Sequence, residues 1–310
     1  MKFHIRMPGL NRYPPNFSPW EAELTSSDMQ MIARKLEGLG FDALSVAEHI
    51  AMPRELARRM SAHWPDAITA MSFLAGATEN IRILSSIIVL PYHNPVVLAK
   101  AVSTLDQLSG GRLTLGFGLG HAEQEFASLG ISFRERAGIM NESLGALIEL
   151  WTAEEPRFQG RHVNFDDVAF APKPVQLPYP PIWIGGHSQA ALRRAARFGD
   201  GWLISRMDLA QLDESLEYLR SQPGFAAKES RFDILMPINP MPPGRYEPWT
   251  AEELARQPKS REQLIDRIGV MADHGVTWTI APLPAGEAKS LSHYLDRASR
   301  AAEEVMSAFR

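Results

Sequence analysis

Arg82-Ile-Leu-Ser-Ser-Ile-Ile-Val-Leu90 is a short apolar run, rich in β-branched residues, and it predicts a buried strand. A helix-period segment follows over residues 95–108, and a second apolar run follows over 113–117. Two parallel strands joined by a helix form a βαβ unit, so this stretch predicts one such unit. The same alternation continues in both directions along the chain.

Eight short apolar runs of this kind occur over the whole length of the chain. They cover residues 3–6, 43–47, 82–90, 113–117, 182–184, 201–204, 232–236 and 276–281. Helices are expected between or after them at 28–39, 67–77, 95–108, 138–151, 189–198, 209–220, 261–274 and 291–308. Eight parallel strands that are each followed by a helix close most naturally as an α/β fold of the (β/α)8 TIM barrel type.

A doubly wound open sheet shares this alternation and is the structural alternative. The number of strands and the lack of a glycine-rich turn after the first one argue against it. A barrel of this type needs about 250 residues, so a chain of 310 residues must carry insertions. We expect them at 48–64, 154–179 and 237–257, the second as a small hairpin. Nothing resembles an interdomain linker, so residues 1–310 are predicted to form a single domain.

The composition of the chain limits the classes of partner that it is expected to bind. It has 32 Lys and Arg against 36 Asp and Glu, with no dense basic tract, which argues against nucleic acid and anionic membranes. A small organic molecule is the expected partner. Cysteine is absent, so thiolate nucleophiles, iron–sulfur clusters and cysteine-type zinc sites are excluded. No secretory signal or long apolar run is present, which favours a cytoplasmic protein.

The carboxyl ends of barrel strands are the place to look for an active site. The second strand ends at Glu48-His49, which puts a carboxylate beside an imidazole that can exchange a proton near neutral pH. The carboxylate could orient the ring or raise its pKa. A surface or structural pair is the other interpretation. The histidines lack metal-ligand spacing, so no metal site is expected.

Two glycine-rich stretches also lie at strand ends. Gly116-Phe-Gly118-Leu-Gly120-His121 would let backbone approach a flat or phosphorylated ligand, although tight barrel packing explains it equally well. Gly185-Gly186-His187-Ser188 runs directly into a helix, where free backbone N–H groups make a site for phosphate. A glycine turn with a serine cap is the alternative for this second stretch.

Several motifs, each weak alone, match one family together. They are Leu105-Asp-Gln-Leu-Ser-Gly-Gly-Arg112, Leu113-Thr-Leu-Gly-Phe-Gly-Leu-Gly120, Glu125-Phe126, Leu129-Gly130, Pro172-Lys-Pro-Val-Gln176, Pro180-Pro-Ile-Trp-Ile-Gly-Gly186 and Gly199-Asp-Gly-Trp202. The chain resembles the luciferase-like monooxygenase superfamily over nearly its entire length. The resemblance implies a (β/α)8 barrel with insertions that binds FMN or the deazaflavin coenzyme F420 and is often a homodimer.

The resemblance also bears on the choice of cofactor. Gly40-Phe-Asp42 with Val46-Ala-Glu-His-Ile50 is similar to the F420-dependent branch, where an acidic residue precedes a histidine at this strand end. FMN-dependent members often carry a second histidine at the next position, where this chain has Ile50. Coenzyme F420 is therefore the expected cofactor, and FMN is the alternative.

Site residues follow from the same resemblance. His49 would sit beside the reactive carbon of the coenzyme as proton donor or acceptor, with Glu48 as its neighbour. A non-proline cis peptide between Ser86 and Ile87 would form a bulge behind the ring. Contacts to the rest of the coenzyme are implied for Gly118, Gly120, His121, Gly185, Gly186 and His187.

Three functions are consistent with these residues. The first is an F420-dependent oxidoreductase that transfers hydride between the deazaflavin and a small organic substrate. The second is an FMN-dependent monooxygenase that inserts oxygen into an organic substrate. The third is a flavin- or F420-binding protein without catalytic activity. Either enzyme needs a lid that excludes water, and residues 48–64 and 237–257 are the candidates.

Overall fold

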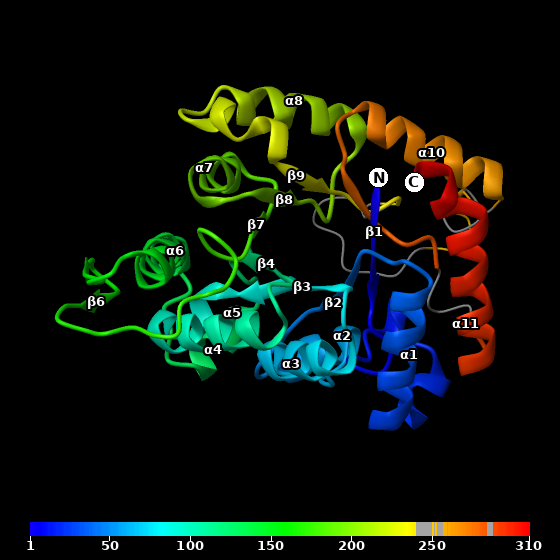
Figure 1. Cartoon of the computed structure of the whole chain (residues 1–310), viewed down its shortest axis with the longest axis horizontal. Helices are drawn as coiled ribbons and strands as arrows, with labels where there is room; N and C mark the ends of the chain where they lie inside the picture. Colours follow the sequence, from blue (N-terminus) through cyan, green and yellow to red (C-terminus); the bar gives the residue numbers. More distant parts are fainter. Residues whose placement is uncertain (240–249, 251, 253–256, 259, 284–287) are drawn as a thin grey trace.

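A closed barrel of eight parallel strands forms the centre of the molecule in the computed structural model (Figure 1). The structure describes residues 1–239, 250, 252, 257–258, 260–283 and 288–310. Around the ring the strands are β1 (Lys2–Arg6), β2 (Ala43–Val46), β3 (Arg82–Val89), β4 (Leu113–Gly118), β7 (Ile182–Gly185), β8 (Gly201–Leu203), β9 (Asp233–Leu235) and β10 (Trp278–Ile280). The predicted TIM barrel is confirmed, and ring closure excludes the doubly wound sheet.

Helices surround the barrel on its outer side (Figure 1). They are α1 (Ser26–Gly38), α3 (Ala67–Ala77), α4 (Pro95–Leu108), α6 (Arg136–Thr152), α7 (Gln189–Phe198), α8 (Leu209–Arg220), α10 (Arg261–Asp273) and α11 (Leu291–Arg300). Local sequence sets several of their starts, because the side chains of Thr25, Asn94 and Ser188 accept hydrogen bonds from the first turns of α1, α4 and α7. None of the described helices is both long and apolar enough to span a bilayer.

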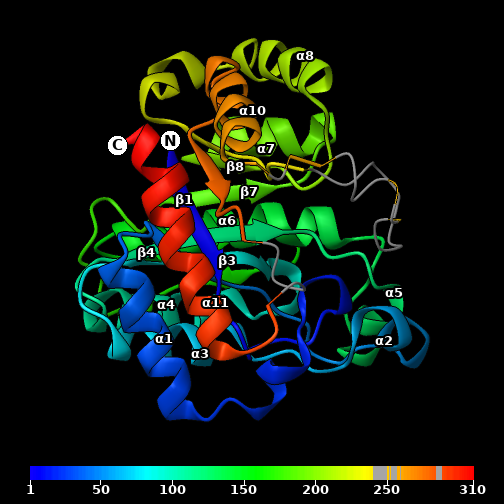
Figure 2. The same cartoon turned by 90° about the vertical axis from the view of Figure 1, so that its right-hand side faces the viewer.

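The insertions add smaller elements at the ends of strands. Helix α2 (Arg54–Met60) lies in the first insertion, and β5 (Phe158–Gln159) with β6 (Asn164–Phe165) form the predicted hairpin in the second. Helix α5 (Glu123–Ser128) follows β4 and was not predicted. The third expected insertion, 237–257, falls largely outside the described residues. The two chain ends lie near each other in both views (Figures 1 and 2), and the rings of Phe3 and Phe309 are 6.1 Å apart.

The side chains of each strand alternate between two cores. Phe3 and Ile5 of β1 pack outward against the helices, so His4 and Arg6 point into the barrel. The lower part of the interior is filled by a separate apolar cluster, whose members are Ala43, Leu84, Trp183, Leu203, Leu235 and Trp278. The Trp183 and Trp278 rings meet edge to face at 5.2 Å and form its floor.

Strand β3 carries an irregularity near its end. Its pairing with β4 shifts register between Ser85 and Ile88, so two residues of β3 oppose one of β4. The Ser86–Ile87 peptide bond within this bulge is cis, as the family resemblance implied. Ser86 lines a cavity in the barrel mouth. The bulge therefore places a backbone kink where a bound ring was expected.

We predict that Gly116→Ala destabilises the barrel at the point where β3 and β4 approach each other. A Cβ at Gly116 would overlap the Ser85 carbonyl oxygen and lie 2.5 Å from Leu203 Cδ1, and backbone cannot move aside cheaply. We expect a loss of about 2 kcal/mol or more in the free energy of unfolding, measured by urea titration. The control is Gly269→Ala in α10, where a Cβ meets open space and a gain of roughly 0.5–1 kcal/mol is expected. Equal midpoints for the Gly116 variant and the wild type would contradict this account.

Candidate active site

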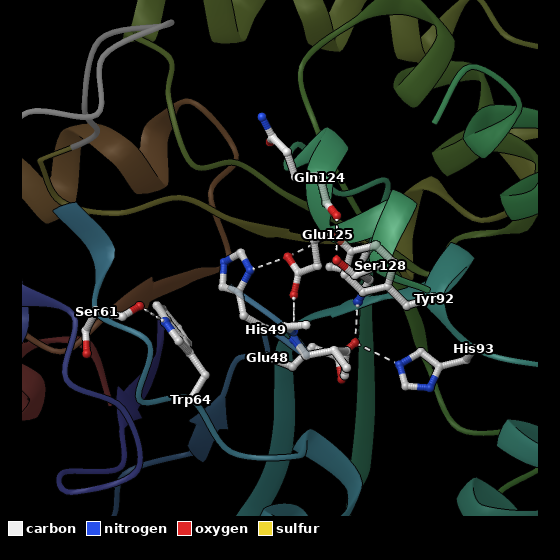
Figure 3. A network of polar contacts seen from close by, with 12 residues as sticks. Glu48, His49, Ser61, Trp64, Tyr92, His93, Gln124, Glu125 and Ser128 are labelled. Carbon is white, nitrogen blue, oxygen red and sulfur yellow. Dashed lines mark hydrogen bonds and ion pairs between the residues drawn. The ribbon is translucent and has the colours of Figure 1, made fainter. Parts of the chain in front are cut away.

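His49 follows β2 at the carboxyl end of the barrel and is held by an acidic residue from another element. Its Nδ1 lies 2.8 Å from Oε2 of Glu125, which α5 provides (Figure 3). Both side chains are largely buried, with 9% of His49 and none of Glu125 exposed. A buried carboxylate at this distance fixes the orientation of the ring and decides which nitrogen exchanges a proton.

Glu125 is the centre of the polar network in Figure 3. Besides the contact with His49, it accepts hydrogen bonds from the backbone N–H groups of Ile50 and Ala51 and from the hydroxyl of Tyr92. Desolvation alone would raise the pKa of Glu125, but the hydrogen bonds from His49, Ala51 and Ile50 outweigh it and lower the pKa. Glu125 is therefore a carboxylate at neutral pH.

Tyr92 joins the end of β3 to the same network. Its hydroxyl lies 3.0 Å from Oε2 of Glu125. Burial, together with the negative charge of Glu125, raises the pKa of Tyr92 well above its usual range. The phenol therefore keeps its proton and donates a hydrogen bond to the carboxylate.

Glu48 does not form the expected pair with His49. Its Oε1 instead accepts the backbone N–H of Val89 at 2.7 Å and lies 2.8 Å from Nε2 of His93. Figure 3 shows Glu48 and His49 turned to different sides, as successive residues leaving a strand are. Glu48 ties the segment after β2 to the end of β3, so it supports the bulge and does not orient His49.

Two aromatic rings pack against His49. The Trp64 ring from the first insertion meets it edge to face at 4.8 Å, and its Nε1 donates to the carbonyl oxygen of Ser61. His121, a predicted cofactor residue, lies 5.7 Å away and follows β4. Partial desolvation and the nearby charges of His49 and Arg206 lower the pKa of His121. The structure thus brings together His49 and His121, which follow β2 and β4 and are two strands apart in the chain.

The predicted glycines have packing roles in the barrel wall. A Cβ at Gly118 would lie 2.7 Å from Ile87 Cδ1, and one at Gly120 would lie 2.7 Å from Val89 Cγ1. Gly185 adjoins the same Ile87 side chain, with its Cβ position 3.6 Å from Ile87 Cγ2. At Gly118 and Gly120 a side chain would crowd the bulge and the end of β3, which is the packing interpretation left open above for that stretch. Contact with a cofactor stays a prediction for each.

The start of α7 keeps the features of a phosphate site. Gly186 has φ of 124°, and Ser188 caps the helix by accepting the N–H of Ala191. His187 stands exposed beside them. These residues follow the end of β7, which lies two strands from β3 in the ring. They and the bulge therefore face the same end of the barrel.

A cavity of about 260 Å³ lies in the barrel mouth on the side of β1, β2 and β10. Ser45, Ser86 and Trp64 line it, together with His4 from β1 and Tyr294 from α11. Burial lowers the pKa of His4 to about 4, so its imidazole is neutral near pH 7. In the described part of the chain, no three His, Asp or Glu side chains gather in a way that could hold a metal ion.

Sequence reasoning missed Glu125, Tyr92 and His93 as parts of the site. Glu125 stood inside the Glu125-Phe126 family motif, but nothing local separates it from the other acidic residues of that segment. Its distance of 76 residues from His49 in the chain hid the contact. Tyr92 and His93 read as a turn after a buried strand, and only the fold shows which carboxylates they face.

A family model described as luciferase-like monooxygenase matches residues 1–239. The chain belongs to this family. It is therefore an oxidoreductase that works with a flavin or deazaflavin. The solved structure of a monooxygenase from Streptomyces bottropensis covers all of the chain with a TM-score of 0.75 and 21% identity, which shows the shared fold.

Curated relatives carry both cofactor types in their names. An uncharacterized protein of Mycobacterium tuberculosis is 27% identical over 86% of this chain and 90% of its own length. An F420-dependent glucose-6-phosphate dehydrogenase of Amycolatopsis mediterranei is 32% identical over 57% of this chain and 53% of its own. An FMNH2-dependent dimethylsulfone monooxygenase of Pseudomonas putida is 29% identical over 51% and 44%.

We predict that Glu125→Gln lowers stability and changes its dependence on pH. An amide offers one acceptor oxygen where the carboxylate receives four hydrogen bonds, and we expect a loss of about 2–3 kcal/mol at pH 7. Because the folded pKa of Glu125 is depressed, its contribution is present above the unfolded pKa of about 4.3 and is lost as pH falls through the folded value.

Urea titrations at pH 7 and pH 3 check this prediction. The difference in the free energy of unfolding between the wild type and Glu125→Gln should be smaller at pH 3 than at pH 7. Glu123→Gln, on an exposed position of the same helix, is the matched control and should stay within about 0.5 kcal/mol of the wild type. A constant gap at both pH values would show that the carboxylate charge is not what matters.

Proposed function

We propose that the protein is an F420-dependent oxidoreductase that transfers hydride between the deazaflavin and a small organic substrate, with His49 as the proton donor or acceptor. The contact between His49 Nδ1 and the buried Glu125 carboxylate carries this proposal. It occupies one ring nitrogen, so Nε2 is left for exchange with a ligand. An imidazole held in this way can accept a proton at Nε2 from a substrate hydroxyl, and in its protonated form it can return one to a carbonyl oxygen.

The residues of the barrel mouth fit a flat ring system. The bulge carries Ser86 into the cavity, and the Ile87 side chain lies against Gly118 and Gly185 in the wall behind it. Gly186, His187 and the first turn of α7 would hold the phosphate of the coenzyme side chain, and His121 would adjoin the ring near His49. When bound, F420 supplies a carbon that carries hydride in a two-electron reaction.

Ile50 supports F420 over FMN. It stands where FMN-dependent relatives often have a second histidine, and its backbone N–H is used by Glu125. The relative named for F420 is also the more similar of the two named for a cofactor, at 32% identity against 29%. An FMN-dependent monooxygenase is the second candidate, and a cofactor-binding protein without turnover is the third.

Trp64 supports a role for the first insertion in covering the site. Its ring packs on His49 and also lines the cavity, while helix α2 lies between it and the end of β2. An insertion that contacts both groups can exclude water from them when a ligand is bound. The other proposed lid, 237–257, falls mostly outside the described residues.

We predict that the purified protein binds F420 more tightly than FMN, measured by fluorescence titration with each. His49→Ala should keep its affinity for F420 within a few fold and lower turnover by roughly 100-fold or more, because loss of a general acid or base costs at least that factor. Turnover is followed by the absorbance of the oxidised deazaflavin with a panel of alcohols and ketones.

The exposed His63 in the same insertion provides the control, since His63→Ala should leave both quantities unchanged. Binding of FMN alone would favour the monooxygenase. Binding of either cofactor without turnover would favour the third function. Undiminished turnover in His49→Ala would remove the role proposed for this residue.

We also propose that the protein is a homodimer acting in the cytoplasm. Apolar side chains stand exposed on α4, with 68% of Val97 and 76% of Leu108 accessible, and 90% of Leu177 on the neighbouring segment. Exposed apolar patches of this kind mark protein contacts. Light scattering should give twice the 34.5 kDa of one chain, and Leu108→Glu should shift the mass toward one chain without unfolding. A wild-type monomer would contradict the dimer.

A further inference from the structure

His4 is a buried imidazole that no protein group satisfies. It points from β1 into the barrel, is only 4% exposed, and neither ring nitrogen has a hydrogen-bond partner. A buried polar group left in this state is costly, and native proteins rarely keep one without a bound molecule to satisfy it. Because burial lowers its pKa to about 4, His4 is neutral and offers one donor and one acceptor.

Tyr294 presents a second unsatisfied polar group to the same cavity. It belongs to α11, near the C-terminal end of the sequence. Tyr294 is 3% exposed, and its hydroxyl has no hydrogen-bond partner. Burial raises the pKa of Tyr294, so it remains a phenol. His4 and Tyr294 are unrelated in sequence and belong to different elements, yet both line this cavity. Two independent unsatisfied groups around one hollow indicate a ligand with a hydrogen-bonding oxygen.

The only arginine among the described cavity-lining residues is already neutralised. Arg6 Nη2 lies 3.1 and 3.0 Å from the two carboxylate oxygens of Glu21 and also donates to the carbonyl oxygen of Asn16. Glu21 itself is buried and further held by the backbone N–H groups of Gly9 and Ser18. A carboxylate or phosphate entering the cavity would therefore meet no uncompensated positive charge among the lining residues that the structure describes.

The cavity adjoins the residue proposed to exchange protons. Trp64 lines it, and the Trp64 ring touches the His49 ring at 4.8 Å. Its remaining wall is largely apolar, with Ile280 and Ala281 at the end of β10. At about 260 Å³ it is several times larger than the roughly 30 Å³ that one water occupies in the liquid. It has room for a small organic molecule.

We propose that the part of this cavity around His4 and Tyr294 is the substrate compartment, beside the coenzyme ring proposed to lie against Ser86, and that it selects uncharged molecules whose hydroxyl or carbonyl oxygen hydrogen-bonds to His4 and Tyr294. This inference rests on the proposed oxidoreductase function and narrows its substrate class. It sets the chain apart from its relative named for glucose-6-phosphate, because a phosphate ester would find no unpaired cation among the described residues that line the compartment.

Binding of three matched probes to the purified full-length protein tests the proposal. Cyclohexanol and cyclohexanone are uncharged, and cyclohexanecarboxylate has a similar body with a negative charge. We expect titration calorimetry to give Kd values for the two uncharged probes that are at least about tenfold lower than that of the carboxylate. Equal or tighter binding of the carboxylate would overturn the proposal, and so would the absence of binding by both uncharged probes.

Tyr294→Phe removes only the hydroxyl, which has no partner to lose, so the variant should fold as the wild type does. It should weaken cyclohexanol binding by about fivefold, the equivalent of one neutral hydrogen bond of about 1 kcal/mol. His4→Leu should weaken it by a similar factor. Tyr218→Phe, on the outer helix α8 away from the cavity, is the matched control and should leave Kd unchanged. Unchanged binding in both cavity variants would overturn the proposal.

The same variants are titrated with F420 to separate this inference from the proposed function. Unchanged F420 affinity together with weaker probe binding places His4 and Tyr294 on the substrate side. Loss of F420 affinity with unchanged probe binding would assign them to the coenzyme and overturn the proposal. The probe measurements need no cofactor, so they still decide the case for the cavity if the wild type binds neither F420 nor FMN.

Discussion

The Glu125 carboxylate is the contact on which the whole candidate site depends. It is buried, yet it gathers donors from two separate parts of the barrel mouth, the segment after β2 and the end of β3. A charge in this position is tolerated only because each oxygen is satisfied. The same bonds that make it tolerable also hold His49 in one orientation, so the stability of the mouth and the chemistry of the imidazole have one origin.

The fold was predictable because its signal is repeated. Eight apolar runs with helices between them allow few topologies, and capping side chains such as Ser188 mark the starts of several helices. The position of His49 at the barrel mouth was also predictable, since it lies just beyond the end of β2. Glu125 was not, because its role depends on two βα units bringing it against a residue that lies far away in the chain. Helix α5 is short and carries no periodic signal strong enough to predict.

Glu48 and the glycines show that the sequence located residues near the barrel mouth without predicting their contacts. The sequence placed Glu48 next to His49, but backbone geometry sends neighbouring side chains apart, and Glu48 binds Val89 and His93 instead. Gly118 allowed both ligand contact and tight packing; the structure shows the packing against Ile87, and ligand contact stays a prediction. His4 gave no local signal, because its meaning comes from a helix at the opposite end of the chain.

The two tryptophans at the floor of the barrel close the cavity at its inner end. Trp183 and Trp278 are buried and packed against each other below it, so traffic through the barrel from the opposite end is blocked. A coenzyme and a substrate would then both enter at the carboxyl end of the strands. If one of them binds below the other, the deeper one has to bind first and leave last.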